Sequence, residues 1–336
     1  MRNNNLTLSD LGEKKIISEI IRKLPLENKG ELLLNDDAQI IPVASTNPIF
    51  ISTDRTPTDL KALCLGVMSL FEYGRYCVIS NLSDIAAMGA FPTGFLLNIA
   101  ASPDMTVDDF EQVMQGVTSA LNEYKIPLLG GDTKEAKQLN LVGIALGQSY
   151  TPEFFTRSGA KPGDYLIISK GFLGLTPTAF EYFNIRDSVS LNISATNIKE
   201  MISSLVDVKA RFSESKILSV SKLCTSCMDN TDGLYSSFLE IVDASQVGLE
   251  IDLSNINIHN STSIIAEKSD KNIHELILSA GADFKLISTV RRLNNDIEES
   301  FQVIGRVNDK SQDIFISGLN ENALEKISRW NHFKSK

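Results

Sequence analysis

The sequence predicts an α+β protein of two domains. Its 336 residues are more than twice the roughly 150 residues of a typical domain. Helix-like and strand-like segments are mixed in both halves without a strict βαβ rhythm. A polar connection over residues 150–163 contains Pro152, Gly159, Pro162 and Gly163, which favour loop structure. We therefore expect an N-terminal domain over residues 1–149 and a C-terminal α+β domain over residues 150–336.

In the first half, the spacing of apolar residues separates helices from strands. Helical spacing predicts helices over residues 11–24, 76–88 and 107–124, and Asp104 is placed to help cap the last of them. Short apolar or alternating runs predict strands over residues 36–43, 48–53, 93–101 and 139–147.

The second half repeats this mixture. Strands are predicted over residues 165–169, 249–253, 284–290, 301–307 and 313–316, and helices over residues 198–205 and 233–242. A turn with two glycines, Lys170-Gly171-Phe172-Leu173-Gly174, follows the first of these strands.

Composition excludes several classes of protein. With 43% hydrophobic and 22% charged residues, the chain is neither disordered nor a coiled coil. A net charge of −10 disfavours nucleic acid as a partner, because such binding needs a basic face. The polar start and the absence of a long apolar run argue against a secretory signal and a membrane span. Four cysteines do not form a disulfide scaffold, so we expect a cytoplasmic protein.

Aspartates beside predicted turns and strand ends are the main chemical signal. They stand in five segments, Asn35-Asp36-Asp37, Ser52-Thr53-Asp54, Asn81-Leu82-Ser83-Asp84, Gly130-Gly131-Asp132-Thr133 and Asp229-Asn230-Thr231-Asp232. Aspartate is common at turns for structural reasons alone. However, Mg²⁺ prefers carboxylate oxygens together with substrate phosphates, so five such sites favour a magnesium-dependent phosphoryl transfer. If the last segment is helical, its two aspartates share one face.

Other nucleotide and catalytic motifs are missing. The sequence contains no GxxxxGK[ST] loop, no GxGxxG, no HExxH and no kinase HRD motif, and it has only three histidines.

These residues carry a family resemblance. From residue 12 to residue 333 the chain resembles the thiamine-monophosphate kinase family, within the superfamily of aminoimidazole-ribotide synthetase-like ATP enzymes. The matching segments, in family order, are Gly12-Glu13, Asn35 to Ala38, Ser52 to Asp54, Asn81 to Ala90, Gly130 to Thr133, Thr156 to Asp164 and Asp229 to Leu234.

The resemblance implies a fold, an assembly and a set of ligands. The fold would be two α+β domains, with a homodimer formed by the N-terminal mixed sheets and ATP near that interface. Mg²⁺ would be held by Asp37, Ser52, Thr53, Asp54, Asp84, Asp132, Asp229 and Asp232. Asp132 and Asp232 would be catalytic, and the ATP contacts would come from Gly131, Asp132, Arg157 and Thr231.

The acceptor half departs from the family pattern. After Ser52-Thr53-Asp54 the family has a histidine that contacts thiamine phosphate, whereas this chain has Lys61 near that position. The family motif G-G-E-D-Y-E is Ala280-Gly281-Ala282-Asp283-Phe284-Lys285 here, so Ala282 replaces a substrate-binding glutamate. Trp330 keeps a family aromatic on which a flat ring could stack. We therefore predict an intact ATP–metal half and low turnover of thiamine monophosphate.

Three functions stay open at this stage. The first is an ATP- and Mg²⁺-dependent phosphotransferase resembling thiamine-monophosphate kinase. The second is a related enzyme that phosphorylates or activates another small acceptor, although the chain lacks the special cysteine of the selenium and hydrogenase-maturation branches. The third is a non-catalytic nucleotide-binding protein, which clustered carboxylates disfavour because they repel one another without a cation. Cys224 and Cys227 form a C-x-x-C pair, interpreted mainly as ordinary thiols near a strand.

Overall fold

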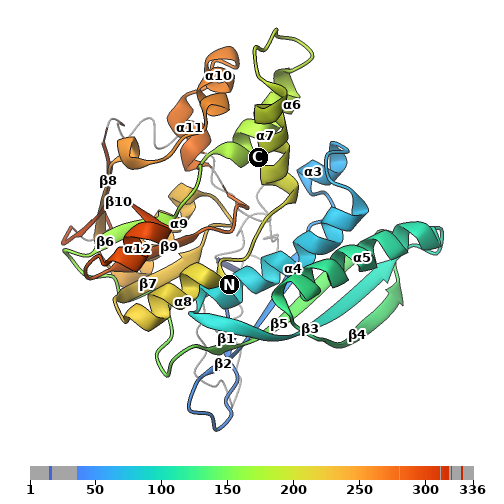
Figure 1. Ribbon diagram of the computed structural model, residues 1–336, viewed down its shortest axis with the longest axis horizontal. Helices are drawn as coiled ribbons and strands as arrows, with labels where there is room; N and C mark the ends of the chain where they lie inside the picture. The colour runs from blue at the N-terminus through green and yellow to red at the C-terminus, as the bar shows by residue number, and fades with distance from the viewer. Residues whose placement is uncertain are drawn as a thin grey trace, which may run out of the picture.

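Two mixed sheets with helices packed against them make up the protein (Figure 1). This computed structural model describes residues 15–16, 36–279, 281–310, 312–317, 319 and 327. Most of the helix predicted over residues 11–24 lies outside the described residues, as do Gly12-Glu13, Asn35 and Trp330.

The first sheet has five strands in the order β1-β2-β5-β3-β4. Only β3 and β4 are parallel, and the other neighbours are antiparallel. The strands are β1 (Gln39–Ile40), β2 (Ile49–Thr56), β3 (Ala90–Ala101), β4 (Leu128–Glu135) and β5 (Asn140–Ser149). The strand predicted over residues 36–43 is therefore only two residues long, which leaves Asp36 and Asp37 in a loop.

Helices α4 (Leu70–Ala87) and α5 (Val107–Tyr124) pack against each other beside this sheet (Figure 1). Helix α4 begins six residues before the predicted start, because Ser69 and Glu72 form a capping box. The predicted range of α5 is confirmed, but its cap is Thr106 and not Asp104: the Asp109 N–H donates to Thr106 Oγ1 at 3.1 Å. Gly116 permits the close helix contact, since a Cβ there would lie 1.8 Å from the carbonyl oxygen of Phe71.

The second sheet has six strands in the order β11-β8-β10-β6-β9-β7, antiparallel except for the β11–β8 pair. Its strands are β6 (Tyr165–Ser169), β7 (Cys224–Asp229), β8 (Gly248–Ile251), β9 (Leu286–Val290), β10 (Phe301–Asn308) and β11 (Ile314–Ile316). Strand β7 was not predicted, and it contains both cysteines of the C-x-x-C pair.

Alternating residues of this sheet pack into two different hydrophobic cores, because successive side chains of a strand point to opposite faces of the sheet. On β6, Leu166 and Ile168 join a core with Phe238 of α9 (Leu234–Ser245), whereas Ile167 joins the core with Leu218 of α8. The second-half helices are α6 (Leu175–Ile185), α7 (Ala195–Val206), α8 (Phe212–Ser221), α9, α10 (Asn260–Lys268), α11 (Ile273–Leu278) and α12 (Asn295–Ser300). The short helix α3 (Lys61–Cys64) precedes α4.

Helices α6 and α7 connect the two halves of the molecule. Ala179 of α6 and Met201 and Leu205 of α7 are buried in the same core as α4 and α5. Within the described part of the chain, no helix has both the length and the apolar character that crossing a bilayer requires.

Candidate active site

Three aspartates from separate elements of the chain meet at one site. Asp37 precedes β1, Asp84 lies on α4 and Asp229 ends β7, and one carboxylate oxygen from each lies within 4.8 Å of the other two. We call these residues the carboxylate cluster. The sequence predicted all three as metal ligands, and the fold brings them together from positions up to 192 residues apart.

Hydroxyl groups hold two members of the cluster in place. The Ser52 hydroxyl donates to Asp84 Oδ2, and the Ser83 hydroxyl donates to Asp229 Oδ2. Asp37 Oδ2 and Asp229 Oδ1 are buried and have no hydrogen-bond partner among the described residues. Buried carboxylate oxygens without donors are costly, so these two atoms fit a bound cation.

The electrostatics of the cluster point to the same ligand. Burial raises the pKa of Asp84 well above the usual carboxyl range, and the charges of Asp229, Asp54 and Asp37 raise it further. The pKa of Asp229 is likewise raised, first by burial and then by Asp37. A divalent cation would relieve this repulsion and allow all the carboxyl groups to ionise.

Arg157 balances part of this charge from the connection between the two sheets. Its guanidinium bonds Asp37 and lies 3.4 Å from Glu240 Oε2, and its backbone N–H donates to Asp36 Oδ1 at 2.7 Å. The sequence predicted Arg157 as an ATP contact, whereas the structure shows its guanidinium engaged with two carboxylates of the protein.

The Ser52-Thr53-Asp54 segment lies on β2 beside the cluster. The Asp54 N–H donates to Asn81 Oδ1 at 2.8 Å, which ties β2 to α4. Thr53 lies apart from the cluster, since its hydroxyl donates to the Gly143 carbonyl on β5 at 3.0 Å.

The sequence predicted the Gly130 to Thr133 segment beside a turn or strand end, and this prediction is wrong. The segment lies inside β4, whose eight residues are all exposed. Strand β4 forms the edge of the sheet opposite β1, so Asp132 lies apart from the carboxylate cluster and pairs with Lys134 at 3.6 Å. Gly131 packs closely on β3, because a Cβ there would lie 1.8 Å from the Leu97 carbonyl oxygen.

The loop after β7 carries Thr231 and Asp232. This loop is not helical, so Asp229 and Asp232 do not share a helix face. Asp232 is exposed, and its charge raises the pKa of the half-buried Tyr76, after the larger effects of burial, Asp54 and Asp229. The Thr231 carbonyl accepts from the Ala282 N–H at 2.9 Å, so the predicted nucleotide and acceptor segments touch.

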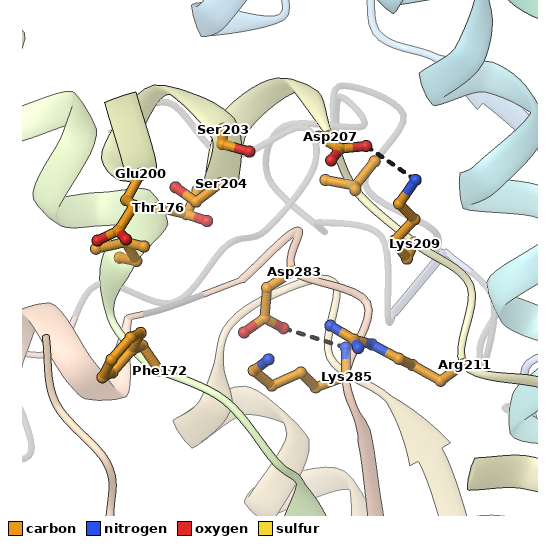
Figure 2. Close-up of a pocket in the computed structure, with 12 residues that line it drawn as sticks. Phe172, Thr176, Glu200, Ser203, Ser204, Asp207, Lys209, Arg211, Asp283 and Lys285 are labelled. Carbon is orange, nitrogen blue, oxygen red and sulfur yellow. Dashed lines mark hydrogen bonds and ion pairs between the residues drawn. The ribbon is translucent and has the colours of Figure 1, made fainter. Parts of the chain in front are cut away.

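Asp283 and Lys285, in the segment from Gly281 to Lys285, help line a pocket of about 330 Å³ (Figure 2). Phe172, residues of α6 and α7, Lys209, Arg211, Asp283 and Lys285 line it. Asn230 joins the pocket to the cluster, because it follows Asp229 and its side-chain amide donates to Asp283 Oδ1 at 3.0 Å.

The predicted substrate residues lie in different places. Ala282 belongs to the segment from Gly281 to Lys285, in a left-handed backbone conformation with φ of 56°. Lys61 begins α3, and its Nζ lies 4.8 Å from the ring centre of Phe180. Trp330 lies outside the described residues. Cys224 and Cys227 are free thiols on β7, and neither belongs to the carboxylate cluster.

Sequence reasoning missed several residues that shape the site. Ser83 and Asn81 stand in the same sequence motif as Asp84. Their position beside Asp84 in a predicted helix could have indicated that they contribute to the site. Asp36 likewise adjoins Asp37. Glu240 on α9, which faces Arg157, stands in no motif, and only the fold reveals it.

Comparisons with known proteins agree with this architecture. Residues 35–149 match the family model of the AIR synthase related protein, N-terminal domain, and residues 161–317 match the corresponding C-terminal domain. Thiamine-monophosphate kinase of Leptospira interrogans is 30% identical over 271 residues, which cover 78% of this chain and 82% of the relative. The chain belongs to the thiamine-monophosphate kinase family.

Other members of the family match over nearly the whole chain. Thiamine-monophosphate kinase of Pyrococcus horikoshii is 28% identical over 320 residues, or 94% of this chain and 96% of the relative. Among solved structures, the AaThiL complex with AMPPCP and TMP superposes with a TM-score of 0.81 at 23% identity, covering 98% of this chain and 100% of that one. The two-domain AIR synthase-like fold predicted from the sequence is confirmed.

Proposed function

We propose that this protein is an ATP-dependent phosphotransferase of the thiamine-monophosphate kinase type, which transfers the γ-phosphoryl group of ATP to the phosphate of thiamine monophosphate. Membership of the family and the curated relatives support this reaction. The observation that carries it in this chain is the carboxylate cluster, in which two buried oxygens have no partner in the described part of the chain and suit a cation bound with nucleotide phosphates.

The residues of the site would act by positioning and charge, as is usual in phosphoryl transfer. A phosphate oxygen of the acceptor attacks the γ-phosphorus of ATP, the bond to the bridging oxygen breaks, and ADP leaves. Asp37, Asp84 and Asp229 would hold Mg²⁺, which when bound neutralises charge on the transferring phosphates. Ser52 and Ser83 would fix the orientation of Asp84 and Asp229 through their hydrogen bonds.

Residues at the rim of the cluster would complete the nucleotide site. Asp54 and Asp232 are exposed near Asp229, where they can meet solvent-borne metal and phosphate. Thr231 would contact the nucleotide from the same loop, and Arg157 would support Asp37 beside it. Asp132 and Gly131 lie too far along the sheet to join this cluster within one chain, so their predicted ATP role requires a second copy.

The exposed strand β4 supports a homodimer. Among the described strands it is at the edge of its sheet, and Leu128 and Leu129 on it are 42% and 55% exposed. An unpaired edge with apolar side chains is a ready surface for association. We propose that two copies meet there and bring Asp132 of one near the cluster of the other; a molar mass near that of one chain by light scattering would refute this.

Two further predictions from the sequence, the domain boundary and the cellular location, are proposed unchanged. The domains are 1–149 and 150–336, and the two sheets on either side of this boundary support the division. The protein acts in the cytoplasm on small molecules, without nucleic acid as a partner, and cell fractionation would test the location.

The test of the function is ADP release from ATP with thiamine monophosphate as acceptor, with and without Mg²⁺. We expect turnover that needs both the acceptor and the metal ion, and its loss in Asp84→Asn. Nucleotide binding without ADP release under any condition would instead support a non-catalytic protein.

A second candidate is a related kinase that acts on another small acceptor. Ala282 in place of the family glutamate favours it, because alanine offers no charge to a cationic thiazolium ring. A panel of phosphorylated acceptors in the same assay would separate the two candidates.

A further inference from the structure

Lys285 is a buried lysine that forms no ion pair with the described residues. Its residue is only 5% exposed and lines the pocket. Among the described residues, its side chain makes no hydrogen bond and no ion pair; the one contact with Asp283 comes from the backbone N–H of Lys285, at 3.2 Å. A buried ammonium group is costly unless an anion or acceptor meets it.

The acidic groups around the pocket are engaged elsewhere. Glu200 bonds His259 at 2.7 Å, and Asp207 pairs with Lys209 at 3.0 Å. Asp283 Oδ1 accepts hydrogen bonds from the Asn230 amide and from the backbone of Lys285. None of these carboxylates lies within ion-pair distance of the Lys285 side chain in the described part of the chain.

Arg211 adds a second donor to the same side of the pocket. Figure 2 shows its side chain extending toward the segment that carries Asp283 and Lys285. Its Nη1 lies 3.5 Å from Glu214, whereas its buried Nε has no partner among the described residues. Lys285 and Arg211 therefore place two cationic side chains on the lining of the pocket.

An aromatic ring also lines the pocket. Phe172 is 49% exposed, and its ring packs edge-on against His259 with 4.9 Å between the ring centres. A flat or apolar part of a ligand can lie on this exposed ring.

We propose that this pocket binds the part of the phosphoryl acceptor distal to its reacting phosphate, and that this part carries an anionic group, a carboxylate or a phosphate, held by Lys285 and Arg211. The proposal rests on the second candidate function above, a related kinase that acts on another small acceptor, and names the class of that acceptor. Asn230 directly follows Asp229 and its amide donates to Asp283 of the pocket lining, so the reacting phosphate of such a ligand would face the carboxylate cluster. The residue at 285 is glutamate in the family motif, so this chain reverses the charge there.

Four matched probes test the proposal by calorimetry in the presence of Mg²⁺ and AMPPCP. All are benzyl phosphates, and the ring carries at its 4-position a hydrogen, a carboxylate, a phosphonate or a trimethylammonium group. We expect one of the two anionic probes to bind most tightly, which also distinguishes carboxylate from phosphate recognition. Lys285→Gln should weaken the binding of that probe about ten- to a hundredfold, because a charge-assisted contact is lost. The affinity for the neutral probe should not change.

Two further variants sharpen the result. Lys285→Glu should reverse the preference toward the trimethylammonium probe, and Lys216→Gln, at an exposed position on α8, is the matched control. If the buried substitutions unfold the protein, Arg211→Gln replaces them, since that side chain is 25% exposed and should lose affinity for the anionic probe alone.

Equal binding of the probes, a preference of the unaltered protein for the cationic one, or no binding of either anionic probe overturns the proposal. ADP release from ATP with the same probes tests the phosphotransferase function separately. Selective binding of an anionic probe without ADP release would count against phosphoryl transfer and leave the pocket assignment standing. ADP release without any preference for an anionic probe would support phosphoryl transfer and overturn the pocket assignment.

Discussion

Arg157 and Asp37 are joined by an ion pair across 120 residues of sequence. The pair ties the loop before the first sheet to the connection that leads into the second sheet. Arg157 also faces Glu240 on α9, so one guanidinium spans three parts of the chain at the edge of the carboxylate cluster. The position of Asp37 therefore depends on a residue that carries no ligand atom of its own.

Removing this guanidinium should destabilise the protein. Arg157→Met leaves Asp37 and Glu240 without their cation, and breaking such a buried pair costs about 3 kcal/mol or more. We expect a clearly lower melting temperature by calorimetry and a weaker response to Mg²⁺. Arg292→Met, at an exposed position, is the control and should melt like the unaltered protein. Unchanged melting of Arg157→Met would show that the pair contributes no net stability.

Two aspartate variants can reveal which residues of the site come from a second copy. Asp84→Asn and Asp132→Asn should each sharply reduce Mg²⁺-dependent ATP turnover while far-UV circular dichroism stays native. If Asp132 acts across a dimer, mixing the two variants should restore activity, because each mixed dimer keeps one intact site. Random mixing would leave about a quarter of all sites intact. If activity does not recover although subunit exchange is verified, then Asp84 and Asp132 belong to the site of the same chain, or they do not act in the site at all.

Metal binding and pH should be linked through the cluster. Since the folded protein raises the pKa of Asp84 and Asp229, it holds their protons more tightly than the unfolded chain does. The free energy of unfolding without metal therefore falls as pH rises from the ordinary carboxyl range toward the raised pKa. Mg²⁺ removes the repulsion, so we expect it to raise the melting temperature more at about pH 8 than at about pH 5.

A variant without one of these charges supplies the control. Asp84→Asn should melt at a higher temperature than the unaltered protein in the absence of metal at the higher pH, and should respond less to Mg²⁺. Asp187→Asn, whose side chain is 90% exposed, should change neither quantity. A Mg²⁺ response that does not depend on pH would contradict the link.

Much of the fold follows from the sequence because the strongest patterns are local. The ranges of α5 and β6 were predicted to the residue, since α5 has apolar residues at regular helical spacing and β6 is a short apolar run after a proline-glycine turn. Helix α8 and strand β7 were missed because polar and thiol residues interrupt their apolar patterns. Their burial comes from packing against distant strands, which no local pattern reports.

The site was predictable where motif and fold coincide, and not elsewhere. Asp37, Asp84 and Asp229 meet as expected, whereas Asp132 lies at the far edge of the first sheet. Spacing along the chain cannot show that β4 pairs with β3 at an edge. The pairing of Arg157 with Glu240 is likewise a product of the packing of α9.

We predict that thiamine monophosphate is a poor substrate of this enzyme. The thiazolium ring of that compound is cationic. In this chain Ala282 provides no carboxylate, and Lys285 and Arg211 present positive charge on the adjoining pocket wall. Losing one charge-assisted contact costs about 1.5–3 kcal/mol, which corresponds to about ten- to a hundredfold or more in affinity.

The decisive comparison is kcat/KM for thiamine monophosphate beside that of the Pyrococcus horikoshii relative under identical conditions. We expect a value lower by about a hundredfold, with ATP binding unaffected because the carboxylate cluster is retained. The double variant Ala282→Glu, Lys285→Glu restores the charges of the family motif, so it should raise kcat/KM by about tenfold or more. Comparable values for the two natural enzymes would show that other contacts bind the thiazolium ring here and that Lys285 does not repel it.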